Sequence, residues 1–88
     1  MRQNKINKKF VYLISPNKIE KNNFYKDLSL VFKSKKVKFF QLRLKNETTR
    51  NKLIIGKKIK KICKKHKVKF LINDEPRLAK KLNADGCH

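Results

Sequence analysis

Two clusters of polar side chains, each beside a short apolar stretch, have the chemistry to bind an anion. The first is Gln41, Arg43 and Lys45, which alternate with leucines. Successive side chains of a strand point to opposite faces, so a strand over residues 37–45 would place all three on one face. Arg offers phosphate a planar fork of donors, and Lys offers a compact charge. The pattern predicts a phosphate-binding face, although an edge strand with one face in water would alternate in the same way.

The second cluster is Asn73-Asp74, directly after the apolar run at residues 70–72. The Asp74 carboxylate could hold Mg²⁺, which commonly takes one or two carboxylates together with phosphate oxygens of a substrate. The Asn73 amide could both donate to and accept from a heterocycle or a phosphate. Residues of these types also cap helices, so a cap for a helix that begins near Pro76 is the alternative interpretation.

The cysteines and histidines do not indicate a zinc site. Cys87 and His88 are adjacent, so in a strand they would face opposite sides. Together with Cys63 and His66 they match no known two-plus-two ligand spacing. Cys63 falls on the apolar stripe of an expected helix, where a small core residue is expected. With two glycines in the chain there is no glycine-rich phosphate loop, and no catalytic residue is assigned.

The elements that must position these groups alternate between strand and helix. Apolar and β-branched runs predict strands at residues 10–15, 37–45 and 68–73, and a fourth strand begins near residue 84. A short helix is expected over residues 75–82. Two longer helices are indicated by apolar residues at helical spacing, namely Phe24, Leu28, Val31 and Phe32, then Ile55, Ile59, Ile62 and Cys63. This order predicts an α/β fold with a parallel sheet.

The composition limits the classes of protein further. The chain has 88 residues, enough for one domain at most, and its net charge is +20. Such a charge favours nucleic-acid binding in general. However, Lys supplies 22 of the 26 basic residues, Arg is scarce, and the charges are spread along the chain, so lysine-rich solvated faces are expected instead. No apolar run approaches the roughly 20 residues of a membrane span. We expect a cytoplasmic protein without a membrane or nucleic-acid partner.

Four motifs in order resemble the thiamine-phosphate synthase family. Val11–Ser15 resembles the opening strand of that family, and Gln41–Lys45 resembles its Gln-Leu-Arg-x-Lys motif. Leu71–Asp74 resembles its Ile-Asn-Asp motif, and Ala84–His88 resembles its Ala-Asp-Gly-Val-His motif. Each motif is weak alone, but their order and spacing make the resemblance fairly specific. It extends from the first expected strand to the last residue.

The resemblance implies a particular fold and reaction. The fold would be the N-terminal portion of a TIM (β/α)8 barrel, with about three and a half βα units in a single partial domain over residues 1–88. The reaction would be that of a transferase in thiamine biosynthesis. This enzyme joins hydroxymethylpyrimidine diphosphate to thiazole phosphate, giving thiamine phosphate and pyrophosphate.

The resemblance also implies roles for single residues. By matching positions, Gln41, Arg43, Lys45 and Asn73 would bind the pyrimidine diphosphate, and Asp74 would be a ligand of Mg²⁺. The later βα units, a second magnesium carboxylate and the thiazole site lie outside the chain. A complementary C-terminal fragment is therefore an expected partner, and no activity is expected from the chain alone. A thiazole tautomerase-like barrel is the related alternative, and a small basic nucleic-acid-binding protein is the alternative from another class.

Overall fold

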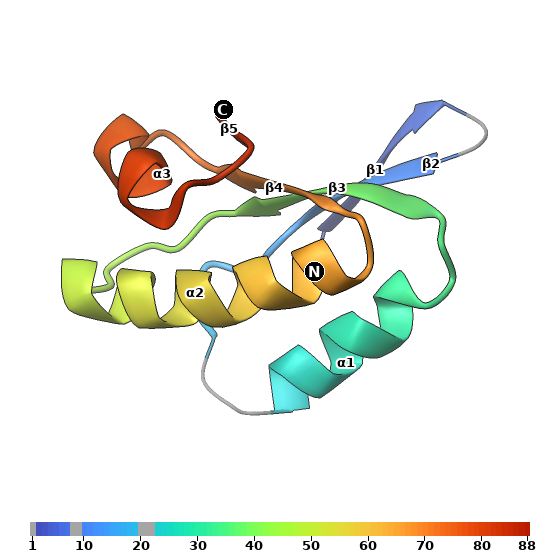
Figure 1. Cartoon of the computed structure of the whole chain (residues 1–88), viewed down its shortest axis with the longest axis horizontal. Helices are drawn as coiled ribbons and strands as arrows, with labels where there is room; N and C mark the ends of the chain where they lie inside the picture. Colours follow the sequence, from blue (N-terminus) through green and yellow to red (C-terminus); the bar gives the residue numbers. More distant parts are fainter. Residues whose placement is uncertain (1, 8–9, 20–22) are drawn as a thin grey trace.

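In the computed structural model, the described part of the chain forms five strands in one sheet, in the order β1-β2-β3-β4-β5 (Figure 1). The structure describes residues 2–7, 10–19 and 23–88, with side chains described for 11–19 and 23–88. The strands are β1 (Arg2–Asn7), β2 (Phe10–Ile14), β3 (Val37–Leu42), β4 (Lys69–Ile72) and β5 (Gly86–Cys87). The helices are α1 (Asn23–Phe32), α2 (Thr49–Lys65) and α3 (Pro76–Leu82). From β2 onward, strands and helices alternate and all strand pairs are parallel, as the sequence predicts.

The strand β1 is absent from the sequence-based expectation. It pairs antiparallel with β2, from Arg2 opposite Ile14 to Asn7 opposite Phe10. Its residues, Arg-Gln-Asn-Lys-Ile-Asn, are mostly polar and show no apolar alternation, so backbone pairing rather than a hydrophobic face defines it. As a result, the edge of β2 that faces away from β3 is paired along the strand (Figure 1).

A single layer of helices covers one face of the parallel sheet. On that face Phe40, Leu42, Phe70 and Ile72 are at most 2% exposed. They pack in one cluster with buried residues of all three helices, including Leu28, Phe32, Ile59, Cys63, Leu78 and Leu82. The predicted helical stripes are therefore confirmed except at Val31, which is 38% exposed. Its neighbour Phe32 takes the inward position, because consecutive helical residues diverge by about 100°.

Close packing between α2 and α3 depends on a glycine. Gly56 is buried on α2, and a Cβ atom built there would overlap the side chain of Leu82. Leu82 belongs to the hydrophobic core, so it has little room to move aside. The missing side chain at Gly56 lets α3 lie directly against α2.

Several loops turn without glycine. Among the residues that the structure describes, five that are not glycine have a left-handed backbone with φ between 51° and 62°, and neither glycine has a positive φ. These residues are Lys35, Asn46, Lys67, Asp74 and Asn83. Asn and Asp tolerate this conformation better than Lys does.

Within the described ranges, no helix is long and apolar enough to cross a bilayer.

Candidate anion-binding site

The carboxyl ends of the parallel strands bring the predicted site residues to one edge of the sheet. Leu42 pairs with Ile72, so Arg43 and Asn73, the next residue of each chain segment, emerge side by side. Backbone bonds continue this alignment past the strand ends, since Asn73 N donates to Leu42 O at 3.0 Å. This edge is where parallel α/β folds carry their ligand sites.

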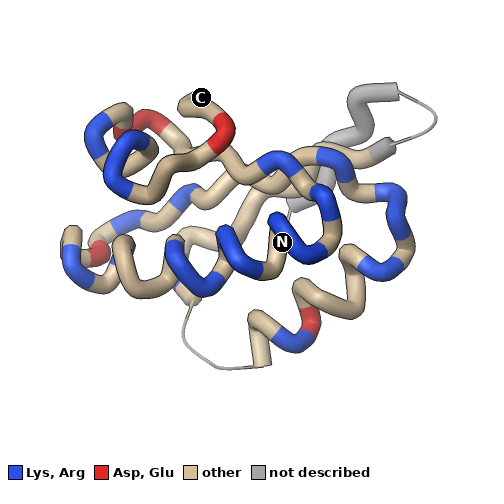
Figure 2. The backbone as a smooth tube through the Cα atoms, in the orientation of Figure 1, with Lys and Arg blue, Asp and Glu red and all other residues tan. Residues whose placement is uncertain are grey.

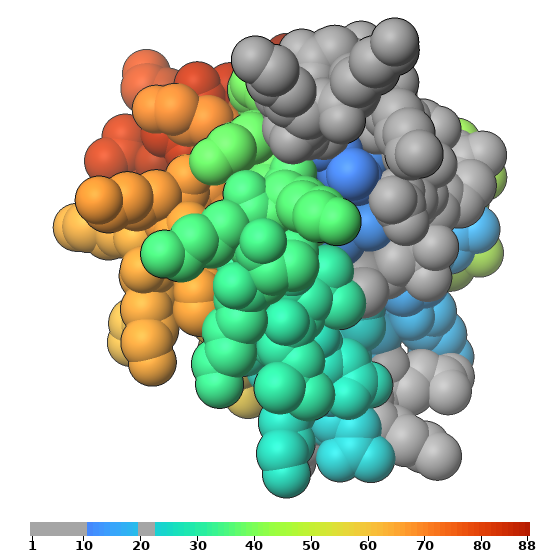
Figure 3. All heavy atoms as spheres, turned by 90° about the vertical axis from the view of Figure 1, so that its right-hand side faces the viewer, coloured from blue at the N-terminus to red at the C-terminus, as the bar shows by residue number. Residues whose placement is uncertain are grey.

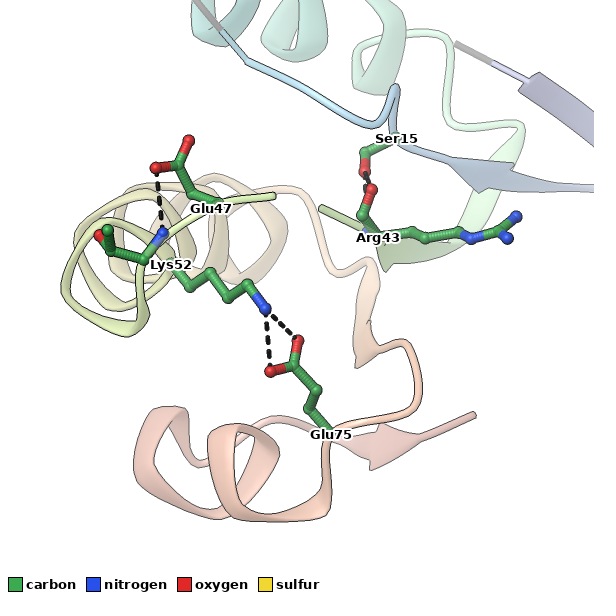
Figure 4. Close-up of polar contacts among 6 residues, drawn as sticks. Ser15, Arg43, Glu47, Lys52 and Glu75 are labelled. Atoms are coloured by element: carbon green, nitrogen blue, oxygen red, sulfur yellow. Dashed lines mark hydrogen bonds and ion pairs between the residues drawn. The ribbon is translucent and has the colours of Figure 1, made fainter. Parts of the chain in front are cut away.

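Ser15 ties the ends of β2 and β3 together. Its side chain is buried, with 4% exposed, and its Oγ accepts a hydrogen bond from Arg43 N at 2.9 Å (Figure 4). Carbonyl oxygens of Pro16, at 3.1 Å, and Arg43, at 3.4 Å, are available to accept the hydroxyl proton. Ser15 therefore holds the Arg43 backbone. The sequence gives only a weak signal of this role, namely a small hydroxyl residue between an apolar run and a proline.

Gln41 lies on the face of β3 opposite the helices, as its alternation predicts. Its side chain is 3% exposed, and Nε2 donates to the Tyr12 hydroxyl at 2.6 Å. Tyr12 in turn stacks on Phe39 with ring centroids 5.8 Å apart. The burial of the Gln41 amide is thus offset inside the protein, and its orientation is set by a neighbouring strand.

Arg43 and Lys45 line a hollow of about 370 Å³ together with Ser15, Pro16 and Asn17. Among the described residues that line it, none is acidic, so two cations face the cavity without a carboxylate. Two cations without a carboxylate favour the binding of an anion such as a phosphate group.

The prediction that the strand continues to Lys45 is wrong, because β3 ends at Leu42. The neighbouring strands β2 and β4 stop at Ile14 and Ile72, so no strand backbone remains to pair with the later residues. Lys45 N instead donates to Asn17 O in the loop after β2, at 2.9 Å. This bond brings Lys45 to the wall of the hollow.

Asn73 and Asp74 lie at the same edge of the sheet but do not line that hollow. Asp74 is exposed and its backbone is left-handed, with φ 57°. The capping interpretation is wrong, since Glu75 occupies the N-cap of α3 and makes no side-chain cap bond. Within residues 11–19 and 23–88, no three His, Cys, Asp or Glu residues group as metal ligands. Asp74 therefore offers a single carboxylate toward a metal.

An ion pair at this edge joins α2 to the residue before α3. Lys52 Nζ lies 2.9 and 3.0 Å from the two carboxylate oxygens of Glu75 (Figure 4). The Arg43 side chain extends away from this pair, so the two charged groups are separate. Nearby, the side chain of Asn51 donates to Glu47 and holds the pKa of that carboxyl below its ordinary value. No local pattern in the sequence indicates the Lys52–Glu75 pair, which joins residues 23 positions apart.

The cysteines take no part in this site. Cys63 is 1% exposed in the core, as predicted, and burial raises its pKa to about 12, with the nearby charge of Asp85 adding to the effect. Such a thiol stays protonated near neutral pH and is a poor metal ligand or nucleophile. Cys87 is exposed at the end of β5.

Comparison with known sequences agrees with the motifs. A family model described as thiamine monophosphate synthase matches residues 11–88. The chain is 82% identical over all 88 residues to the thiamine-phosphate synthase of Pelagibacter ubique (strain HTCC1062), of which it covers 42%. It is also 42% identical over 50 residues to the thiamine-phosphate synthase of Flavobacterium johnsoniae, which is 57% of this chain and 24% of that protein. The chain thus spans less than half the length of these curated relatives.

Comparison with solved structures agrees with the fold. Thiamine phosphate pyrophosphorylase from Pyrococcus furiosus superposes with a TM-score of 0.73 at 22% sequence identity. The match covers 86% of this chain and 36% of that chain, so the parallel sheet and its helices correspond to the N-terminal portion of a TIM-barrel-like fold. With a family model covering most of the sequence and four of its motifs in order, the chain belongs to the thiamine monophosphate synthase family.

Proposed function

We propose that the chain supplies the diphosphate-binding part of a thiamine-phosphate synthase. The enzyme would join hydroxymethylpyrimidine diphosphate and thiazole phosphate to give thiamine phosphate and pyrophosphate. The observation that supports this most is the hollow at the carboxyl end of the sheet, where Arg43 and Lys45 present two cations without a carboxylate among its described lining. Of the groups on the two substrates, the diphosphate of the pyrimidine is the one that such a pair of cations fits best.

Each predicted binding residue has a place in this proposal. Arg43 and Lys45 would contact the diphosphate directly from the walls of the hollow. Asn73 emerges beside Arg43 and would donate to the phosphate or the pyrimidine. Gln41 lies deeper, held by Tyr12, and would contact the pyrimidine end. Ser15 would act as a positioning residue, because its hydroxyl holds the Arg43 backbone.

Asp74 would be a ligand of Mg²⁺. The donor set fits the ion only in part: among the described residues, Glu75 pairs with Lys52 and Glu47 accepts from Asn51, which leaves the Asp74 carboxylate for the ion. One carboxylate together with diphosphate oxygens is a common magnesium arrangement. When bound, the ion would stabilise the charge of the departing pyrophosphate. We expect no tight Mg²⁺ binding to the chain in the absence of a diphosphate.

The remaining part of the site would come from sequence that this chain does not cover. The chain covers 42% of the Pelagibacter ubique relative, so the thiazole site and any second magnesium ligand would belong to the rest of the barrel. A fragment that supplies this rest is the partner we propose. We expect the chain alone to show no synthase turnover.

Co-expression tests the proposal. The chain is produced with the part of the Pelagibacter ubique relative that it does not cover, and thiamine phosphate formation is measured. We expect activity, and we expect Arg43→Ala to lower it about 10²–10³-fold, the effect of removing one charge-stabilising donor. Arg77→Ala on α3 is the matched control, because Arg77 lies outside the hollow. Equal losses in both variants would contradict the assignment of the hollow.

A direct binding measurement gives the same test without turnover. Calorimetric titration with pyrophosphate and Mg²⁺ should give a signal that Arg43→Ala weakens and Arg77→Ala leaves unchanged. Arg43→Lys should be intermediate, because it keeps the charge and loses the planar fork of donors. Pyrophosphate binding that is indifferent to Arg43 would remove the hollow from the proposed site.

A further inference from the structure

The fold gathers lysines that are spread along the sequence. They meet at the amino ends of the parallel strands, which is the end of the sheet opposite the candidate site. Three segments contribute: residues 33–38 after α1, residues 60–67 at the end of α2, and the start of β4. Figure 3 looks onto this end, where the segment after α1 and the segment from α2 into β4 lie side by side. The loop after α1 is basic over most of its length (Figure 2).

One hollow at this end lies between the last turns of α1 and α2. Its volume is about 490 Å³. Its walls are almost entirely cationic where they meet solvent, with Lys33, Lys35, Lys38, Lys65 and Lys67. The two rings that line it, Phe32 and His66, contact each other edge to face with centroids 5.9 Å apart. Phe32 is buried, so the exposed part of the hollow consists of lysine side chains and part of His66.

A second hollow adjoins the first through Lys67, which lines both. Its volume is about 430 Å³, and Lys60, Lys64 and Lys69 add to its charge. Lys60 and Lys64 are one turn apart on the same side of α2, and Lys67 follows in the loop after the helix. The one carboxylate among the described residues of either lining is Asp85, whose Oδ2 accepts from Phe70 N at 2.7 Å. The two hollows form a continuous cationic surface, here called the amino-end lysine surface.

The residue types at this surface favour one kind of ligand. The arginines whose side chains are described, Arg43, Arg50 and Arg77, lie at the other end of the sheet or at the starts of α2 and α3. The surface thus has point charges but no planar forks with which to read bases. An acidic protein partner would need an apolar or aromatic anchor, and the described lining exposes none. A phosphodiester backbone needs only a run of cations.

We propose that the amino-end lysine surface binds the backbone of a nucleic acid without reading its sequence. This property is independent of the synthase proposal, because it uses the opposite end of the sheet. The basic residues are dispersed along the sequence, but the fold brings those of three segments together at this surface. The scarcity of arginine remains, and it limits the interaction to sequence-independent, salt-sensitive contact with phosphates.

Fluorescence anisotropy tests this with a labelled oligonucleotide of about 20 nucleotides, longer than a usual single-strand binding site. One variant changes Lys35, Lys38, Lys64 and Lys67 to Gln. Its matched control changes Lys57, Lys61, Lys80 and Lys81 to Gln, all exposed and outside both hollows. Both variants have the same net charge. We expect the first to bind about tenfold more weakly, with the slope of log affinity against log salt reduced by about 3, and the control to bind nearly as the parent does.

Several outcomes would overturn the proposal. Equal losses in the two variants would show that net charge alone attracts the oligonucleotide. Equal competition by poly-glutamate of matched charge would point to an acidic polypeptide instead. Circular dichroism checks that both variants fold.

Lysine acetylation of the unmodified chain tests the same surface without variants. Bound oligonucleotide should protect Lys35, Lys64 and Lys67 from acetylation but not Lys57 or Lys80. Uniform protection of all these lysines would refute the proposed surface.

Discussion

Adjacent residues of β3 lie in opposite surroundings. Phe40 is fully buried beneath the helices, and its ring meets Phe32 edge to face with centroids 6.0 Å apart. Phe39, one residue earlier, is half-buried on the other face and stacks on Tyr12. The helix-covered face is wholly apolar, whereas the other face also holds the buried amide of Gln41. The first face stabilises the fold. The second face carries Gln41, close to the site at the ends of the strands.

The two phenylalanines give the largest expected difference. Phe40→Ala should lower the free energy of unfolding by about 3–5 kcal/mol, because it removes a fully buried ring and leaves a cavity. Phe39→Ala should cost no more than about half as much, since that ring is already partly in water. Urea denaturation measures both. Equal costs would show that the second face is packed as tightly as the first.

The two cysteines are the same chemical group in buried and exposed surroundings. At pH 8 a thiol with a pKa of about 12 has on the order of a thousandfold less thiolate than an ordinary cysteine. A thiol reagent should therefore modify Cys87 and leave Cys63 unmodified until the chain unfolds. Mass spectrometry after digestion identifies the labelled residue. Rapid labelling of Cys63 under native conditions would contradict the packing of α2 against the sheet.

The raised pKa of Cys63 also has a consequence for stability. The unfolded chain ionises this thiol from about its ordinary value of 9.0, whereas the folded chain keeps it protonated up to about 12. The folded state therefore binds more protons in this window, and the stability from the buried thiol is lost as pH rises through it. Cys63→Ala removes this component, so its stability should fall less steeply between those pH values.

A smaller effect on stability is expected for the buried polar pair. Gln41→Leu should lower the free energy of unfolding by about 1–3 kcal/mol, because the Tyr12 hydroxyl loses its hydrogen-bond partner. Adding Tyr12→Phe should recover part of that loss. A double-mutant cycle by urea denaturation measures the coupling. Additive effects would mean that the Gln41–Tyr12 bond contributes nothing to stability.

Much of the fold follows from periodicity in the sequence. The alternation around Phe40 and Leu42 assigns their face correctly, and helical spacing places Ile59 and Cys63 in the core. The period of the apolar residues and the residue types are local properties of the sequence. They therefore predict helices and strands, and which side of each is buried, well. Where β3 ends is not local, because it depends on where β2 and β4 stop. The strand β1 was missed for a similar reason: its polar residues reveal nothing until β2 pairs with them.

In the candidate site too, some features follow from local sequence and others depend on contacts between distant residues. Residue type and alternation single out Arg43 and Lys45, and both line one hollow in the structure. The contacts of Ser15 with Arg43 and of Tyr12 with Gln41 span 28 and 29 residues, so no local pattern indicates them. The position of Asp74 outside the hollow is likewise a property of loop geometry, since its left-handed backbone turns the chain there.

Lys35 and Lys67 have a strained, left-handed backbone and also carry a positive charge. A side chain in this conformation costs on the order of 1 kcal/mol, which glycine avoids. Glycine at either position would also remove a positive charge and so reduce self-repulsion in a chain of net charge +20. Both lysines belong to the amino-end lysine surface. Thermal stability and polyanion affinity should therefore change in opposite directions at these positions: Lys67→Gly should melt at a higher temperature and bind the oligonucleotide more weakly.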